Sequence, residues 1–170
     1  MGTVNFQGKP VHLAGQLPAM HSKAPALSGV DTNFQPRSLE AFKGKKKIIC
    51  FAPSLDTPVC SLSAKKFNEQ MKAHPEAVII YCSLDLPPAL KRLCLSDTAH
   101  YDRVVFLSLF RDILVAGEYG VYIQEGPLSG LCARAVFVLS EDNTVIYEEL
   151  VPEITDEPSY TAAIQSLSSS

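Results

Sequence analysis

The sequence predicts an α/β protein built around a mixed central β-sheet. Short apolar runs of the kind that form buried strands alternate with segments of helical periodicity, and this alternation implies parallel strands. Two further runs, 133–139 and 144–150, alternate in polarity and are separated by a polar Ser-Glu-Asp-Asn turn, which predicts an antiparallel hairpin. A chain of 170 residues can bury a substantial core, so we expect a single domain over 1–170.

The N-terminal third is expected to lead into the first buried strand. Residues 3–14 predict a β-hairpin extension, with Gly8 in the turn. Residues 15–36 are polar and rich in proline and are expected to be extended, and a short helix is predicted over 38–42. The apolar run over 46–51 then predicts a central strand buried on both faces.

The middle of the chain predicts a longer helix between two strands. A helix is expected over 58–73, because apolar residues roughly fit one of its faces. A second buried strand is predicted over 77–84. The residues expected to form the apolar face of that helix are Val59, Leu62, Phe67 and Met71.

The remaining elements are shorter. Pro87 falls near the start of a helix predicted over 87–95, where proline is well tolerated. A third strand over 104–107 and a short helix over 111–116 that stops at Gly117 follow. After the C-terminal hairpin, the last helix is predicted over 158–167, before a frayed tail over 168–170.

The first turn of the helix predicted over 58–73 carries a cysteine in an unusual position. Thr57 is a preferred N-cap residue, and Pro58 falls at the first helical position. Cys60 is then the third helical residue, where a capping box would place a carboxylate. The free N–H groups and the positive end of the helix dipole favour thiolate over thiol. A reactive cysteine directly after a buried strand is typical of a thioredoxin-like fold.

Composition excludes several classes of function. The net charge is −3, and the lysines over 43–47 are interpreted as a solvated turn, so we expect no nucleic-acid partner. The longest apolar run, 77–82, is too short to span a bilayer, so we expect no membrane partner. The first 25 residues hold no signal-peptide pattern, so a cytoplasmic location is expected, with the periplasm left open.

The five cysteines do not form a disulfide scaffold or a metal site. Their number is odd, their spacing is wide, and no C-x-x-C or zinc-finger spacing occurs. We therefore expect no metal and no cofactor. Cys50 and Cys82 lie in apolar strands, and Cys132 is close to Arg134 in sequence, so all three are interpreted as packing residues. Spacing alone leaves Cys94 open between a structural and a redox role.

At this point the sequence resembles a known family. Pro53, Thr57 and Cys60 match the peroxiredoxin motif P-x-x-x-T-x-x-C, and the rest of the chain is similar to the bacterial thiol peroxidases, which are atypical two-cysteine peroxiredoxins. The motifs that carry this resemblance are V-x-F-x-G-x-P-V over 4–11, S-L-D-T-P-V-C over 54–60, D-L-P over 85–87 leading to R-x-C over 92–94, S-x-F-R over 108–111, G-P-L-x-G-L-x-A-R-A-V over 126–136 and E-I-T-x-E-P-x-Y over 153–160.

The resemblance implies a role for each site residue. Cys60 matches the peroxidatic cysteine and Cys94 the resolving cysteine of the same chain. Thr57 and Arg134 match the residues around the peroxide and the thiolate, and Pro53 matches the residue that shields the pocket. The resemblance also implies a homodimer and thioredoxin as the reductant. The alternative for Arg134 is a structural salt bridge, because a charge that interrupts an apolar strand needs a partner.

The resulting expectation is a thioredoxin-dependent peroxidase acting in antioxidant defence. It would reduce hydrogen peroxide and alkyl hydroperoxides through a Cys60 sulfenic acid and a Cys60–Cys94 disulfide. Asp56 would oppose thiolate formation if it pointed inward, so we expect it to face solvent. The alternative function is a peroxide-sensing relay that passes its disulfide to a partner. A thiol–disulfide oxidoreductase is disfavoured by the missing C-x-x-C, and a plain binding module leaves the context of Cys60 unexplained.

Overall fold

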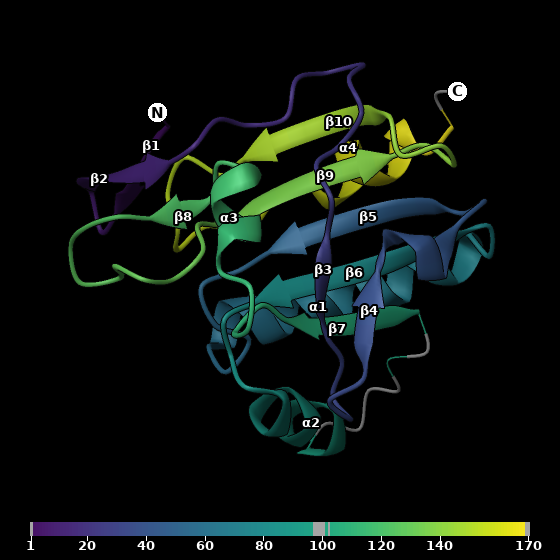
Figure 1. Ribbon diagram of the computed structural model, residues 1–170, viewed down its shortest axis with the longest axis horizontal. Coiled ribbons are helices and arrows are strands. Elements are labelled where there is room, and N and C mark those ends of the chain that lie inside the picture. The colour runs from purple at the N-terminus through teal and green to yellow at the C-terminus, as the bar shows by residue number, and fades with distance from the viewer. Residues whose placement is uncertain (1, 97–100, 102, 169–170) are drawn as a thin grey trace.

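The central sheet has seven strands, and its middle is parallel. The computed structural model describes residues 2–96, 101 and 103–168. The strands lie in the order β10-β9-β5-β6-β7-β3-β4, of which β10 to β7 can be followed side by side in Figure 1. The parallel strands are β5 (Lys46–Phe51), β6 (Ala77–Ser83) and β7 (Val104–Ser108). β9 (Ala135–Leu139) pairs antiparallel with β5 and with β10 (Val145–Leu150). The mixed sheet predicted from the sequence is confirmed.

The two faces of this sheet are covered by different elements. Side chains alternate along β5, so that Ile49 and Phe51 enter one core while Ile48 and Cys50 enter the other. The second core is closed by α1 (Pro58–Gln70) and α4 (Tyr160–Ser166), which lie behind the sheet in Figure 1. On the opposite face lies α3 (Leu114–Glu118).

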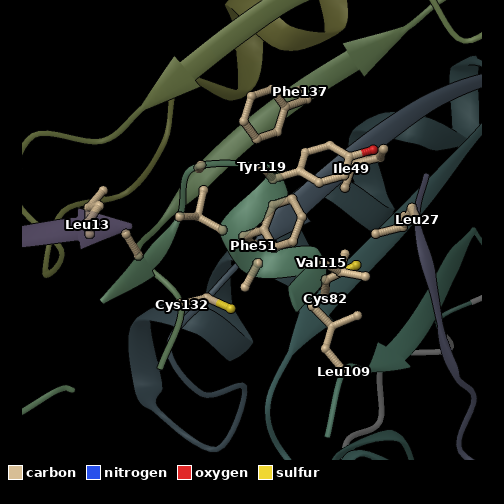
Figure 2. Close-up of a cluster of buried hydrophobic side chains, with 14 of the residues drawn as sticks. Leu13, Leu27, Ile49, Phe51, Cys82, Leu109, Val115, Tyr119, Cys132 and Phe137 are labelled. Atoms are coloured by element: carbon tan, nitrogen blue, oxygen red, sulfur yellow. The ribbon is translucent and has the colours of Figure 1, made fainter. Parts of the chain in front are cut away.

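The core on the α3 side is organised by three aromatic rings (Figure 2). The ring centroids of Phe51 and Tyr119 are 5.0 Å apart, and those of Tyr119 and Phe137 are 5.4 Å apart. These spacings are typical of favourable aromatic pairs. Because Phe51 is the last residue of β5, this packing fixes the end of the strand from which the Cys60 loop departs.

A smaller sheet is built on the N-terminal hairpin. β1 (Thr3–Phe6) and β2 (Lys9–Ala14) pair antiparallel, with positive φ at Gln7 and Gly8 in the turn, as the sequence predicts. The structure adds β8 (Tyr122–Ile123), which pairs with β2 and was not predicted because it has only two residues.

The segment predicted to be merely extended contributes two short strands at one end of the sheet, β4 forming its edge. β3 (Ser28–Val30) and β4 (Pro36–Ser38) pair with each other, and β3 joins the large sheet through Val30 and Ser108. Both are three residues long and contain Gly29 or Pro36, so strand propensity gives no local signal for them. The short helix that follows is the 3-10 helix Leu39–Phe42.

The apolar face predicted for the 58–73 helix is partly wrong. α1 is followed by the 3-10 helix Met71–Ala73, and Phe67 and Met71 are buried as expected. Leu62, however, is 44% exposed, and Val59 is only half-buried. The buried face instead contains Cys60, Ser63 and Ala64. The helix therefore turns Cys60 toward the sheet together with Phe67, and this leaves Leu62 on its exposed face.

The other helices lie close to their predicted positions. α2 spans Pro87–Ser96. α3 spans Leu114–Glu118, so the predicted start at 111 and the predicted stop at Gly117 are both too early. The tail prediction for 169–170 falls outside the described residues. None of the described helices has the length and apolar character needed to cross a membrane.

Candidate active site

Cys60 occupies the third residue of α1, as the sequence predicts. Thr57 is the N-cap residue in an extended conformation, and Pro58 is the first helical residue. The Thr57 hydroxyl, however, donates to the carbonyl oxygen of Ser54 at 2.9 Å and does not cap the helix. The expectation that the Thr57 side chain caps α1 is therefore wrong. The hydroxyl closes the preceding turn instead, at the protein surface.

The Cys60 sulfur contacts a buried guanidinium. Arg134 Nη2 donates to Cys60 Sγ at 3.2 Å, and Arg134 Nε donates to the carbonyl oxygen of Ile154 at 3.0 Å. Cys60 is 0% exposed and Arg134 is 4% exposed. Within the described part of the chain, no carboxylate forms an ion pair with Arg134. A buried cation needs compensation. Glu157 interacts with the guanidinium electrostatically, and Cys60 Sγ accepts its hydrogen bond directly.

Strand register explains why these two residues meet. β9 runs antiparallel to β5, and its first residue, Ala135, lies opposite Phe51, the last residue of β5. Arg134 precedes Ala135, so it stands beside the start of the loop that leads to α1. Sheet pairing thus delivers the guanidinium to the helix N-terminus.

The loop before Cys60 is anchored by the carboxylate of Asp85, which the sequence places in the D-L-P motif without indicating a role for it. Asp85 Oδ1 accepts from Ser54 Oγ at 2.7 Å, and Asp85 Oδ2 accepts from the Leu55 N–H and from Ser83 Oγ, each at 2.7 Å. Pro53, in the same loop, is buried. The available sequence signal was that Asp85 follows the end of β6, at the same sheet edge as the end of β5.

A cluster of hydroxyl groups lies beneath the first turns of α1. Ser63, one turn after Cys60, bonds to the Tyr81 hydroxyl of β6 at 2.5 Å, and both residues are buried. Tyr160 of α4 packs its ring against Phe67 of α1, with 4.7 Å between the ring centroids, and donates to Glu157 Oε1 at 2.8 Å. Burial raises the pKa of both tyrosines, so they remain neutral donors. The cluster joins α1 to β6 and α4.

Cys94 lies on α2, which projects beyond the β7 side of the sheet in Figure 1. Its side chain is half-buried, and burial raises the pKa of its thiol. In the described structure Cys94 and Cys60 are separate thiols. Asp56 faces solvent as expected, and its Oδ2 accepts from Arg92 Nη2 of α2 at 2.6 Å.

The other three cysteines are core residues, as predicted. Cys50, Cys82 and Cys132 are each at most 1% exposed. Burial raises the pKa of all three thiols, that of Cys132 to about 12. A buried thiol that stays protonated is inert as a nucleophile, so these three cysteines are not candidates for the reactive residue.

Comparisons with known proteins agree with this geometry. The redoxin family model matches residues 19–164. A thiol peroxidase from Leptospira interrogans serogroup Icterohaemorrhagiae serovar copenhageni is 43% identical over 164 residues, covering 96% of each chain. A thiol peroxidase from Mycobacterium bovis is 40% identical over 167 residues, covering 98% of this chain and 99% of the relative.

Solved structures give the same result. A peroxiredoxin-like protein from Aquifex aeolicus superimposes with a TM-score of 0.88 at 38% identity, covering 98% of this chain and 96% of the other. The thiol peroxidase from Chromobacterium violaceum has a TM-score of 0.90 at 24% identity, covering 98% and 95%, and supports the thioredoxin-like peroxiredoxin fold. The chain therefore belongs to the redoxin family, and within it to the peroxiredoxin-type thiol peroxidases.

Proposed function

We propose that Cys60 is the peroxidatic residue of this peroxidase and that Cys94 resolves its oxidised form. The observation that supports this most strongly is the contact between the buried Arg134 guanidinium and Cys60 Sγ at 3.2 Å. A cation, burial and the N-terminus of a helix thus meet at a single sulfur atom.

The first step is nucleophilic attack on the peroxide. The Cys60 thiolate attacks the terminal oxygen, the O–O bond breaks, and water or an alcohol leaves after taking up a proton. Cys60 is oxidised to a sulfenic acid and the peroxide is reduced. Preorganised donors stabilise charge that develops on the oxygens, and the planar guanidinium of Arg134 can reach the sulfur and a peroxide oxygen together. Thr57, whose hydroxyl lies at the surface before α1, is assigned to contact the incoming peroxide.

The second step regenerates a reducible form. The Cys94 thiol attacks the Cys60 sulfenic sulfur, the S–O bond breaks, the S–S bond forms, and water leaves with the Cys94 proton. A thioredoxin-type dithiol then reduces the disulfide by exchange. The half-buried position of Cys94 on a short helix supports this assignment, because such a segment can open locally.

The substrates proposed are hydrogen peroxide and alkyl hydroperoxides. Cys60 belongs to a buried apolar cluster that includes Leu55 and Ala64, and such surroundings favour a substrate with an apolar part. The homodimer implied by the family resemblance stays a prediction, as does the cytoplasmic location.

Peroxide consumption coupled to NADPH, thioredoxin reductase and thioredoxin tests the proposal. We expect sustained turnover in the parent and none in Cys60→Ser. In Cys94→Ser, we expect oxidation to stop after one equivalent of sulfenic acid. Stoichiometric oxidation of the parent without turnover at saturating thioredoxin would instead favour the peroxide-sensing relay.

A further inference from the structure

Two carboxylates connect the Cys60 loop to the helix that carries Cys94. The first is Asp85, which holds the Ser54 hydroxyl and the Leu55 N–H on the loop side. Asp85 stands two residues before Pro87, the first residue of α2, and its own carbonyl oxygen accepts from the Ser108 hydroxyl. Because Asp85 is partly buried and its carboxylate accepts from three donors, it anchors the root of α2 to the loop.

The second carboxylate is Asp56, which reaches further along the same helix. Its Oδ2 lies 2.6 Å from Arg92 Nη2, and the two side chains are 62% and 67% exposed. Arg92 is two residues before Cys94 on α2. The ion pair therefore holds the turn of α2 that carries Cys94, whereas Asp85 holds the N-terminal end of the same helix.

Disulfide formation requires this arrangement to change. Cys60 is fully buried with its sulfur on Arg134, while Cys94 is a separate half-buried thiol. Joining them requires Cα atoms within about 7 Å and sulfurs turned toward each other. At least one of the two segments must move, and the ion pair resists separation of the turns that it connects.

We propose that Asp56 and Arg92 form a salt-sensitive latch that holds α2 against the Cys60 loop and slows formation of the Cys60–Cys94 disulfide. Arg92 is then a positioning residue for the resolving cysteine. Asp85 is the fixed pivot about which the released helix opens. This inference rests on the proposed function, because it needs Cys94 to be the resolving residue.

The predicted effect is modest, because both side chains are solvent-exposed. Removing the latch in Arg92→Gln is expected to accelerate disulfide formation about two- to fivefold at low ionic strength, the range of an exposed ion pair. Salt screens exposed charges, so raising the ionic strength should accelerate the parent toward the rate of Arg92→Gln, while the variant itself changes little.

The neighbouring residue provides a matched control. Lys91 is also an exposed cation on α2, and its Nζ donates to Asn33 Oδ1 at 3.2 Å, away from the Cys60 loop. Lys91→Gln removes the same charge from the same helix and leaves the latch intact. It is expected to match the parent in rate and in salt dependence.

The experiment is a single turnover without thioredoxin. Reduced protein is mixed with one equivalent of hydrogen peroxide, quenched with acid at successive times, alkylated, and analysed by intact mass for the sulfenic acid and the disulfide. We compare the parent with Arg92→Gln, Asp56→Asn, the double variant and Lys91→Gln. Each protein is measured at about 20 mM salt, where exposed charges are weakly screened, and at about 500 mM salt, where they are strongly screened. The double variant should be no faster than either single variant, because each removes the same latch.

A second readout separates the latch from a general loss of structure. With excess peroxide, the sulfenic acid either condenses with Cys94 or is oxidised further to sulfinic acid. A faster resolving step predicts less sulfinic acid per turnover in Arg92→Gln than in the parent. A merely destabilised protein would lower the rate of the first step and would not shift this branching.

The outcomes decide between the two proposals. An Arg92→Gln rate equal to that of the parent at low salt, or an acceleration also seen in Lys91→Gln, overturns the latch. If one equivalent of peroxide produces no Cys60–Cys94 disulfide in the parent, the proposed resolving role of Cys94 fails instead.

Discussion

Arg134 and Cys60 are 74 positions apart in the sequence, yet a guanidinium nitrogen of one lies 3.2 Å from the sulfur of the other. The contact depends on the register that places Ala135 opposite Phe51, and it is sealed from solvent. Arg134 is also bonded to the carbonyl oxygen of Ile154, so its orientation is set before any substrate arrives. Preorganisation of this kind lets the donor act without reorganising during the reaction.

The first prediction concerns the guanidinium group of Arg134, which donates from two of its nitrogens. Arg134→Lys retains a positive charge but cannot donate in one plane to both Ile154 and Cys60. We expect kcat/KM for peroxide to fall about 10²-fold or more, as for loss of one preorganised donor. Initial rates of Cys60 oxidation, followed by mass spectrometry without thioredoxin, would measure the change.

The control for that variant is Arg111→Lys. Arg111 is exposed and lies over the Phe110 ring, with 5.2 Å between its guanidinium carbon and the ring centroid. The parental rate is expected in Arg111→Lys. Equal losses in both variants would show that arginine chemistry in general, and not the contact with Cys60, sets the rate.

The second prediction concerns the buried hydroxyl pair beneath α1. Ser63→Ala removes the partner of the Tyr81 hydroxyl, and an unsatisfied buried donor costs about 1–3 kcal/mol. Replacing both partners, in Ser63→Ala with Tyr81→Phe, should cost less than the sum of the two single changes. Urea unfolding of the four proteins measures this coupling, and strictly additive losses would show that the two hydroxyls do not interact.

The third prediction is a loss of stability at alkaline pH. Burial raises the pKa of Cys132 to about 12, above its unfolded value of about 8.5. The folded protein therefore retains a proton that the unfolded chain loses, and this contribution is complete below pH 8.5 and disappears as pH rises toward 12. For one thiol the slope is about 1.4 kcal/mol per pH unit.

Cys132→Ala tests that slope. The free energy of unfolding is measured from about pH 8 to about pH 11. It should fall less steeply with pH in this variant, by the slope that corresponds to the release of about one proton. Burial also raises the pKa of Cys82 and Cys50, so these two thiols still make the stability of the variant fall with rising pH. A parent whose stability does not change over this range would contradict the prediction.

The fourth prediction compares two glycines with positive φ. Gly15 has φ of +80°, and a Cβ there would overlap the carbonyl oxygen of Gly117, while Gly44 has φ of +76° and open space around it. Both alanine variants carry the backbone penalty, about 1–2 kcal/mol. Gly15→Ala should lose about 1–3 kcal/mol more, because the packed backbone must shift. Thermal unfolding compares them, and equal losses would exclude the close approach as the cause.

The parts of the fold that local sequence specifies were predicted well. The long apolar runs over 46–51 and 77–84 correspond to β5 and β6, because strands buried on both faces are almost continuously apolar. The short strands β3 and β8 escaped prediction because they are only three and two residues long. Their pairing is provided by neighbours distant in sequence, which no local pattern records.

Within the site, the sequence by itself determined the placement of Cys60 in the first turn of a helix, because Thr57 and Pro58 set that boundary through backbone preferences that act over a few residues. Only the tertiary structure decided which side chains surround it. The guanidinium of Arg134, the carboxylate of Asp85 and the Asp56–Arg92 pair reach the loop through strand register and helix docking. Those contacts join segments 30 to 74 positions apart, and they depend on packing free energy summed over the whole sheet.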